Sequence, residues 1–99
     1  MNKPTASLSL QIIPTTKNKE ETLHIIDKVI GQIADSGLSY EVGPMETTIE
    51  GNLNELIELL KKAQQVAIEA GAESVFSNVK IIYNPKGVMT INEKVDKHR

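Results

Sequence analysis

The 99-residue chain contains no cysteine, no tryptophan and only one phenylalanine and two tyrosines. The absence of cysteine excludes disulfide bonds, cysteine-ligated zinc and thiol chemistry. The scarcity of aromatic residues means that the core must be built from Leu, Ile, Val and Ala. No apolar run approaches the ~18 residues of a membrane span, and the opening residues Met1 to Pro4 hold no apolar signal segment. We therefore expect a cytoplasmic protein that does not bind a membrane.

Neither sign of charge predominates, because 11 Lys and Arg residues meet 13 Asp and Glu residues, for a net charge of −2. A nucleic-acid surface needs a clustered excess of Lys and Arg, so we expect no nucleic-acid partner. The length suits a single domain, residues 1–99, that can bury a core of its own.

Patterns typical of enzymes and metal sites are also missing. His24 lies on the polar side of a predicted helix and His98 lies in the C-terminal tail, and neither has ligand or triad partners at useful spacing. Gly51 is not followed by the Lys-Ser/Thr of a phosphate-binding loop. Glu46 and Glu50 are separated by about 13 Å along one strand, too far for paired catalytic carboxylates. We expect no enzyme, no metal and no resident cofactor.

Alternation of apolar and polar residues predicts four strands. These are Ala6–Ile13, Ser39–Val42, Met45–Glu50 and Ser74–Tyr83. Gly43-Pro44 separates the second strand from the third, and it predicts a tight turn because glycine tolerates positive φ and proline lacks an N–H.

An Asn followed three residues later by Glu predicts a helix start at Asn18 and again at Asn52, and Gly37 and Gly71 predict the two ends. Gly31 lies inside the first helix, where it costs about 1 kcal/mol relative to Ala, so we expect it to pack closely on the sheet. The predicted apolar stripes are Leu23, Ile26, Val29, Ile30, Ile33 and Ala34 in the first helix, and Leu53, Leu56, Ile57, Leu60, Ala63, Ala67 and Ala70 in the second.

A third capping pattern, from Thr90 to Glu93, predicts a short C-terminal helix over about residues 90–98. Ile91 and Val95 are too little apolar surface to hold such a helix in water alone. We expect it to dock on another element or on another subunit.

Each long helix lies between two strands, so the chain reads βαββαβ. This pattern predicts an α+β, ferredoxin-like fold, a four-stranded antiparallel sheet with two helices on one face and a short C-terminal helix. Right-handed crossovers place the first and third strands in the middle. The helices should cover Leu8, Leu10, Ile12, Met45, Ile49, Val79 and Ile81. The open face should present Ser7, Ser9, Gln11, Ile13, Glu46, Thr48, Glu50, Phe76, Asn78, Lys80 and Ile82.

Small, neutral hydrogen-bonding groups dominate that open face, beside Phe76 and Ile82. Such a face suits contact with a partner subunit, a ligand or both, although an ordinary half-solvated face is the simpler alternative. Two function classes follow: a small-molecule binding protein, or a structural or regulatory module whose open face serves only oligomerisation.

Four segments resemble the thiamine-binding protein family: Leu8 to Pro14, Gly37 to Tyr40, Pro44 to Gly51 and Glu93 to Val95. The most specific element is Thr-x-Ile-Glu-Gly. The resemblance covers nearly the whole chain and implies a ferredoxin-like fold and no known catalysis. It also implies homodimers or homotetramers built by extending and stacking sheets. Related two-repeat proteins bind thiamine or its hydroxymethylpyrimidine half.

An aminopyrimidine presents N–H donors beside ring acceptors, which a carboxylate with amide or hydroxyl groups can match, and its flat ring needs an apolar wall. The expected ligand-binding residues on the open face are Ser9, Gln11, Thr48, Glu50, Phe76 and Asn78. The family motif adds Thr47. Strand alternation turns Thr47 toward the helices, so either a bulge redirects it or it is structural.

Overall fold

Strands and helices follow one another in the order that the sequence predicts. The computed structural model describes residues 3–99; Met1 and Asn2, on which part of the signal-segment expectation depends, lie outside this range. The elements are β1 (Ala6–Pro14), α1 (Lys19–Asp35), β2 (Ser39–Val42), β3 (Thr47–Gly51), α2 (Leu53–Glu69), β4 (Val75–Tyr83) and α3 (Ile91–Val95), with a 3₁₀ turn at Asp96–His98.

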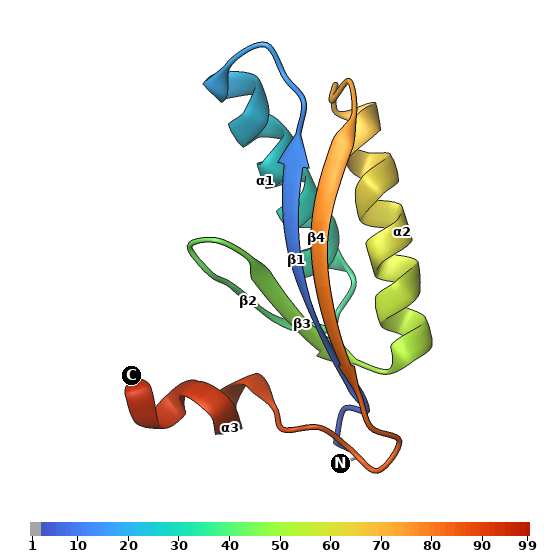
Figure 1. Cartoon of the computed structure of the whole chain (residues 1–99), viewed down its shortest axis with the longest axis vertical. Coiled ribbons are helices and arrows are strands. Elements are labelled where there is room, and N and C mark those ends of the chain that lie inside the picture. The colour runs from blue at the N-terminus through green and yellow to red at the C-terminus, as the bar shows by residue number, and fades with distance from the viewer. Residues whose placement is uncertain (1–2) are drawn as a thin grey trace.

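The four strands form one antiparallel sheet in the order β2-β3-β1-β4. β1 and β3 therefore occupy the middle, as right-handed crossovers require. Both long helices lie behind the sheet in Figure 1, on the same face. The ferredoxin-like α+β fold is confirmed.

Side-chain caps begin both long helices where the sequence predicts them. Asn18 and Asn52 each accept a hydrogen bond from the backbone N–H three residues on. Only Asn52 forms the reciprocal pair, with the Glu55 carboxylate accepting from the Asn52 N–H. In α1, Glu21 accepts instead from the Lys17 N–H at 3.2 Å.

Two glycines end the helices in the left-handed region, Gly37 at φ 78° and Gly71 at φ 115°. Gly43 was expected to use a positive φ in the turn, but its φ is not positive. Its N–H donates to the Glu46 carbonyl at 2.9 Å, and an added Cβ would lie 2.7 Å from that oxygen. The hairpin therefore requires glycine at this position because of close approach.

The expectation for Gly31 is wrong, because this residue is exposed on α1 and an added Cβ would meet no atom within 4 Å. Its cost to helix stability is therefore not offset by packing within one chain.

Replacing Gly31 by alanine is expected to raise the free energy of unfolding by about 1 kcal/mol, because alanine restricts the unfolded chain and favours helix. Urea unfolding followed by circular dichroism measures it. Gly71→Ala is the control and should lower stability, since its φ of 115° strains an L-residue. A loss of stability in Gly31→Ala would contradict the prediction.

The core lies between the helices and the middle strands, with Leu8 and Ile49 at 0% exposure. From the helices it receives Ile25, Val29, Ile33, Leu56, Leu59, Ala63 and Ala67. The buried face of each helix is rotated relative to the prediction. Ile25 is buried in place of Leu23, which is exposed, and Leu59 is buried in place of Ile57. Apolar residues cover more of each helix than the sheet can bury, so their spacing alone did not fix which of them face inward.

Three residues expected under the helices are exposed instead. Met45 lies in the hairpin turn before β3 begins and is 73% exposed. Val79 and Ile81 do share the helix face, opposite Leu10 and Leu8, but they are 36% and 43% exposed. β4 is an edge strand, and the helices leave its helix-facing side chains partly uncovered.

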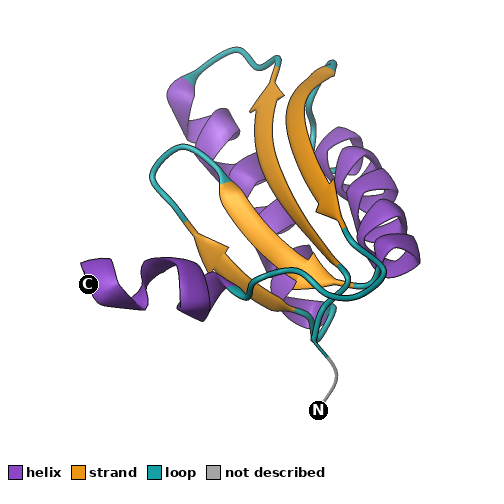
Figure 2. Cartoon of the chain, turned by 60° about the horizontal axis from the view of Figure 1, so that its bottom comes forward, coloured by secondary structure: helices purple, strands orange, loops and turns teal. Residues whose placement is uncertain are grey.

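The short α3 docks on the chain's own sheet. Figure 2 shows it beside β2 and β3, away from the two long helices. Among residues 3–99, no helix combines the length and apolar character needed to cross a membrane.

Candidate functional site

A pocket of about 280 Å³ lies between α1, the outer end of β1 and the β2–β3 hairpin. Its lining residues are Leu10, Gln11, Ile12, Ile26, Val29, Ile30, Ile33, Val42, Gly43, Pro44, Met45, Glu46 and Thr47. Most are aliphatic. The pocket forms because the hairpin stands away from α1 at this end of the sheet, so part of the wide apolar stripe of α1 faces the gap.

Thr47 contributes a hydroxyl to this pocket. It lies opposite Leu10 on β1 and Val42 on β2, and it is 8% exposed. The pairing of β3 with β1 runs without interruption from Thr47 to Gly51, so no bulge redirects the side chain. Thr47 therefore faces the helices, as alternation requires, and its hydroxyl is the polar group that this wall offers.

Glu46 is the single ionisable residue of the lining, and its carboxylate does not serve the pocket. It pairs with the Lys80 ammonium at 3.4 Å on the opposite side of the sheet. The pocket is thus an uncharged, mostly aliphatic concavity with one hydroxyl, which suits a flat neutral ring.

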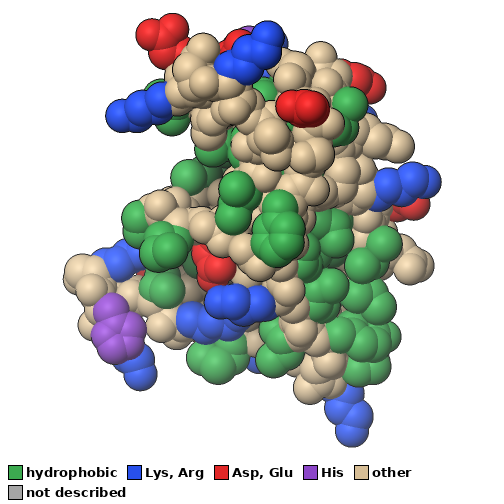
Figure 3. Space-filling view, turned by 45° about the horizontal axis from the view of Figure 1, so that its top comes forward, with side chains coloured by type: hydrophobic (Ala, Val, Ile, Leu, Met, Phe, Trp, Pro, Cys, Tyr) green, Lys and Arg blue, Asp and Glu red, His purple; other side chains and the backbone are tan. Residues whose placement is uncertain are grey.

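The sheet face opposite α1 and α2, here named the outer face, carries the other six predicted ligand-binding residues. The strand register brings Ser9 beside Thr48, Gln11 beside Asn78, and Phe76 beside Ile13. Glu50 lies opposite Ser7. Figure 3 shows hydrophobic side chains around a central group of acidic and basic ones.

Several of these six groups already have partners within the chain. The Asn78 amide donates to Gln11 Oε1 at 3.0 Å, and Glu50 Oε2 accepts from the backbone N–H of Ile91 at 2.8 Å. Phe76 is 64% exposed and provides no enclosed wall. The structure brings Ser9 and Thr48 together in a shallow hollow of about 290 Å³, where the buried Ser9 hydroxyl lacks a hydrogen-bond partner.

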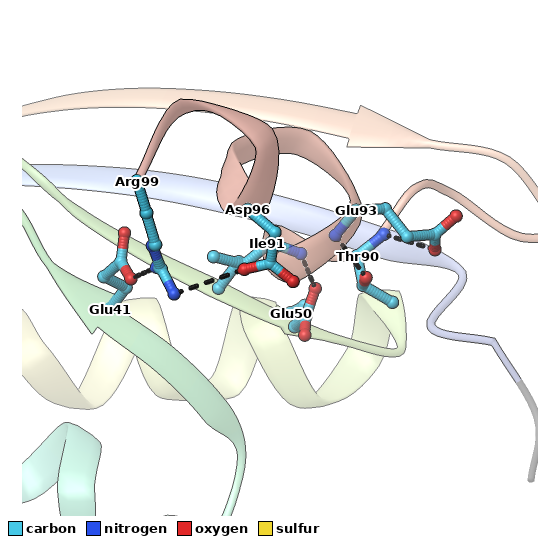
Figure 4. Close-up of polar contacts among 7 residues, drawn as sticks. All are labelled: Glu41, Glu50, Thr90, Ile91, Glu93, Asp96 and Arg99. Atoms are coloured by element: carbon cyan, nitrogen blue, oxygen red, sulfur yellow. Dashed lines mark hydrogen bonds and ion pairs between the residues drawn. The ribbon is translucent and has the colours of Figure 1, made fainter.

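The contact between Glu50 and α3 is a feature that the sequence reasoning missed. Figure 4 shows Glu50 at the start of α3, with Thr90 and Glu93 capping the same turn. The pKa of the Glu93 carboxyl lies below its ordinary value, chiefly because it accepts the hydrogen bond of the Thr90 backbone N–H. No local pattern could have paired Glu50 with Ile91, since they are 41 positions apart.

The aliphatic wall of the pocket was also missed. Ile26 and Ile30 were placed in the core stripe of α1, but both remain half-buried beside the pocket. One feature of the sequence could have indicated this wall: the apolar stripe of α1 is wider than contact with the sheet alone requires. Across residues 3–99, no three His, Cys, Asp or Glu side chains come together as a metal site.

Comparison with known proteins places the chain in a family. A model of the family described as thiamine-binding protein matches residues 8–99. A protein of an uncharacterised family from Clostridium perfringens is 47% identical over 95 residues, which are 96% of this chain and 98% of that protein.

Two solved structures share the fold and much of the sequence. A domain of unknown function from Bacillus cereus has 44% identity and a TM-score of 0.85, covering 95% of this chain and 89% of that one. A Thermotoga maritima protein, provisionally described as a thiamine biosynthesis/salvage protein, has 32% identity and a TM-score of 0.84, covering 95% and 98%. The chain therefore belongs to the thiamine-binding protein family.

Proposed function

We propose that this protein binds thiamine or its hydroxymethylpyrimidine half and catalyses no reaction on it. The family is named for thiamine binding, and the Thermotoga maritima relative is described in terms of thiamine biosynthesis or salvage. The observation that carries the proposal is the uncharged pocket between α1 and the hairpin. Thr47, the first residue of the Thr-x-Ile-Glu-Gly motif, lies in its wall.

The pocket fits one aromatic ring better than a whole phosphorylated cofactor. Its volume of about 280 Å³ lies near the lower limit of small-molecule pockets. Ile26 and Ile30 offer a flat aliphatic surface, and the Thr47 hydroxyl can both donate to a ring nitrogen and accept from an amino group. Met45 at the rim is exposed and flexible, so it can close over a ring.

The outer face is the second candidate location for the ligand. The partnerless Ser9 hydroxyl beside Thr48 supports it. A ligand there would compete with the hydrogen bonds that already join Gln11 to Asn78 and Glu50 to Ile91. Because breaking these hydrogen bonds costs free energy, the pocket is the better supported site.

Calorimetric titration of the intact protein with thiamine, and separately with hydroxymethylpyrimidine, tests the proposal. Saturable heat with either compound supports a binding function. Chromatography of the same mixtures over time should show that neither compound is consumed. No heat with either compound at millimolar concentration, on folded protein, would refute the ligand assignment.

We further propose that the protein forms a homodimer or homotetramer. The outer face exposes Phe76 by 64%, Ile82 by 57% and Ile13 by 46%, and β4 leaves a nine-residue strand edge unpaired in the described chain. Burying such surface against a second copy is favourable. If this face serves assembly alone, the protein is a structural or regulatory module, which would self-associate without binding either compound.

Light scattering at micromolar concentration should report a mass above 10.9 kDa for the wild-type chain. Phe76→Ser is expected to shift the population toward monomer, because it removes apolar area from the outer face. Leu23→Ser is the matched control, since Leu23 is 51% exposed on α1 and lies away from that face. A wild-type monomer at this concentration would contradict self-association.

A further inference from the structure

The C-terminal segment, residues 88–99, lies against the outer face and is named the clasp here. Its base is fixed firmly. The Val88 N–H donates to the Pro4 carbonyl at 2.8 Å, and just before it the Asn84 N–H donates to the Thr5 carbonyl at 2.9 Å. Val88 and Ile91 are each 6% exposed. The clasp therefore starts from a tethered, apolar anchor.

From Ile91 onward the clasp is held by two carboxylates of the sheet. Glu50 Oε2 accepts the Ile91 N–H at 2.8 Å, and the Arg99 guanidinium pairs with Glu41 at the far end (Figure 4). Apart from half-buried Val95, residues 92–99 are exposed. A five-residue helix is not stable in water alone, so these polar contacts decide whether the far part stays docked.

The closed clasp covers one end of the outer face. Ser7 lies opposite Glu50 and points to the outer face, yet it is only 5% exposed. Asn78 occupies the same face farther along the sheet and is exposed. Lys94 of α3 forms part of the wall of the hollow that contains Ser7, Ser9 and Thr48. The clasp therefore builds one side of the hollow in which the buried Ser7 lies.

We propose that the part of the clasp beyond its anchor, residues 92–99, opens and closes over the outer face, and that Glu50, which accepts the Ile91 N–H where α3 starts, is the group that holds it closed. Glu50 Oε2 already accepts the Ile91 N–H, so another donor to this oxygen competes with the clasp. A ligand or second copy that takes over this hydrogen bond therefore favours the open clasp, which makes the contact autoinhibitory. The inference does not depend on thiamine binding.

Thiol labelling tests the inference directly, because the chain has no cysteine of its own. Ser7→Cys introduces one thiol under the clasp, and Asn78→Cys introduces one outside it. The Ser7→Cys thiol should react much more slowly than the Asn78→Cys thiol. Glu50→Gln, combined with Ser7→Cys, keeps the shape of the Glu50 side chain but removes its charge. This double variant is expected to be labelled about five- to tenfold faster than Ser7→Cys alone.

Hydrogen exchange gives a second measurement on the cysteine-free protein. The Lys94 N–H donates to the Thr90 carbonyl at 3.2 Å inside α3, so its exchange rate reports the docked helix. Glu50→Gln should raise this rate, whereas Glu46→Gln, a carboxylate of the same face with no bond to the clasp, should not. Equal labelling of the two thiols, or unchanged exchange at Lys94 in Glu50→Gln, would overturn the proposal.

Discussion

Replacing Leu8 by alanine is expected to lower the free energy of unfolding by about 2–5 kcal/mol, the range for a leucine removed from a well-packed core. Leu8 lies on β1, between β3 and β4, and is 0% exposed beneath the helices. Neighbours on both sides hold the cavity open, because the strand pairing fixes Ile49 across from it. Urea unfolding at fixed protein concentration measures the loss.

Ile81→Ala is the matched control for this experiment. Ile81 lies directly opposite Leu8 on the same sheet face, but on the edge strand and with 43% exposure. Its removal should therefore cost much less, since less apolar area leaves contact. Equal losses for the two variants would contradict the assignment of Leu8 to the core and of Ile81 to the edge of the sheet.

The parts of the fold that the sequence predicted are those set by neighbouring residues. The Asn18 and Asn52 caps, the glycines that end the helices and the alternation of β1 all depend on contacts within a few positions. The strand register then followed, because a shift of one residue would turn Leu8 outward and Ser9 inward. This is why the faces of Ser9, Gln11, Thr48, Glu50, Phe76 and Asn78 could be assigned correctly, whereas that of Thr47 was left open between alternation and a bulge.

The parts that were not predicted depend on how elements lie relative to one another. The burial of Ile25 in place of Leu23 depends on the rotation of α1, and the exposure of Ile81 depends on how far the helices reach over β4. The apolar stripe of α1 is wide enough to allow either rotation of the helix. The spacing of apolar residues along the chain determines neither this rotation nor how far the helices reach over β4.

The candidate site shows the same limit. The outer-face set was a sound prediction of which side chains share a face, but the pocket required the hairpin to stand away from α1. The role of Glu50 required Ile91 to return to β3 from the end of the chain. Because of this long-range contact, Glu50, which was predicted to be free to bind a ligand, already accepts a hydrogen bond within the chain.

Thr47→Val is expected to weaken thiamine or pyrimidine binding about tenfold or more, if the ligand occupies the pocket. Valine has nearly the shape of threonine, so the aliphatic wall is kept while the hydroxyl is removed. A bound ring would then lose its partner at a position that is only 8% exposed, and an unpaired buried polar group is costly. Calorimetric titration measures the affinity, and urea unfolding verifies that the variant is folded.

Thr48→Val is the matched control, because it makes the same chemical change at the next residue on the opposite face. Thr48 lies beside Ser9 in the hollow of the outer face and does not line the pocket. The pocket assignment therefore requires a large loss in Thr47→Val and nearly unchanged affinity in Thr48→Val. The reverse result would place the ligand on the outer face, because only there does the Thr48 hydroxyl have access to it.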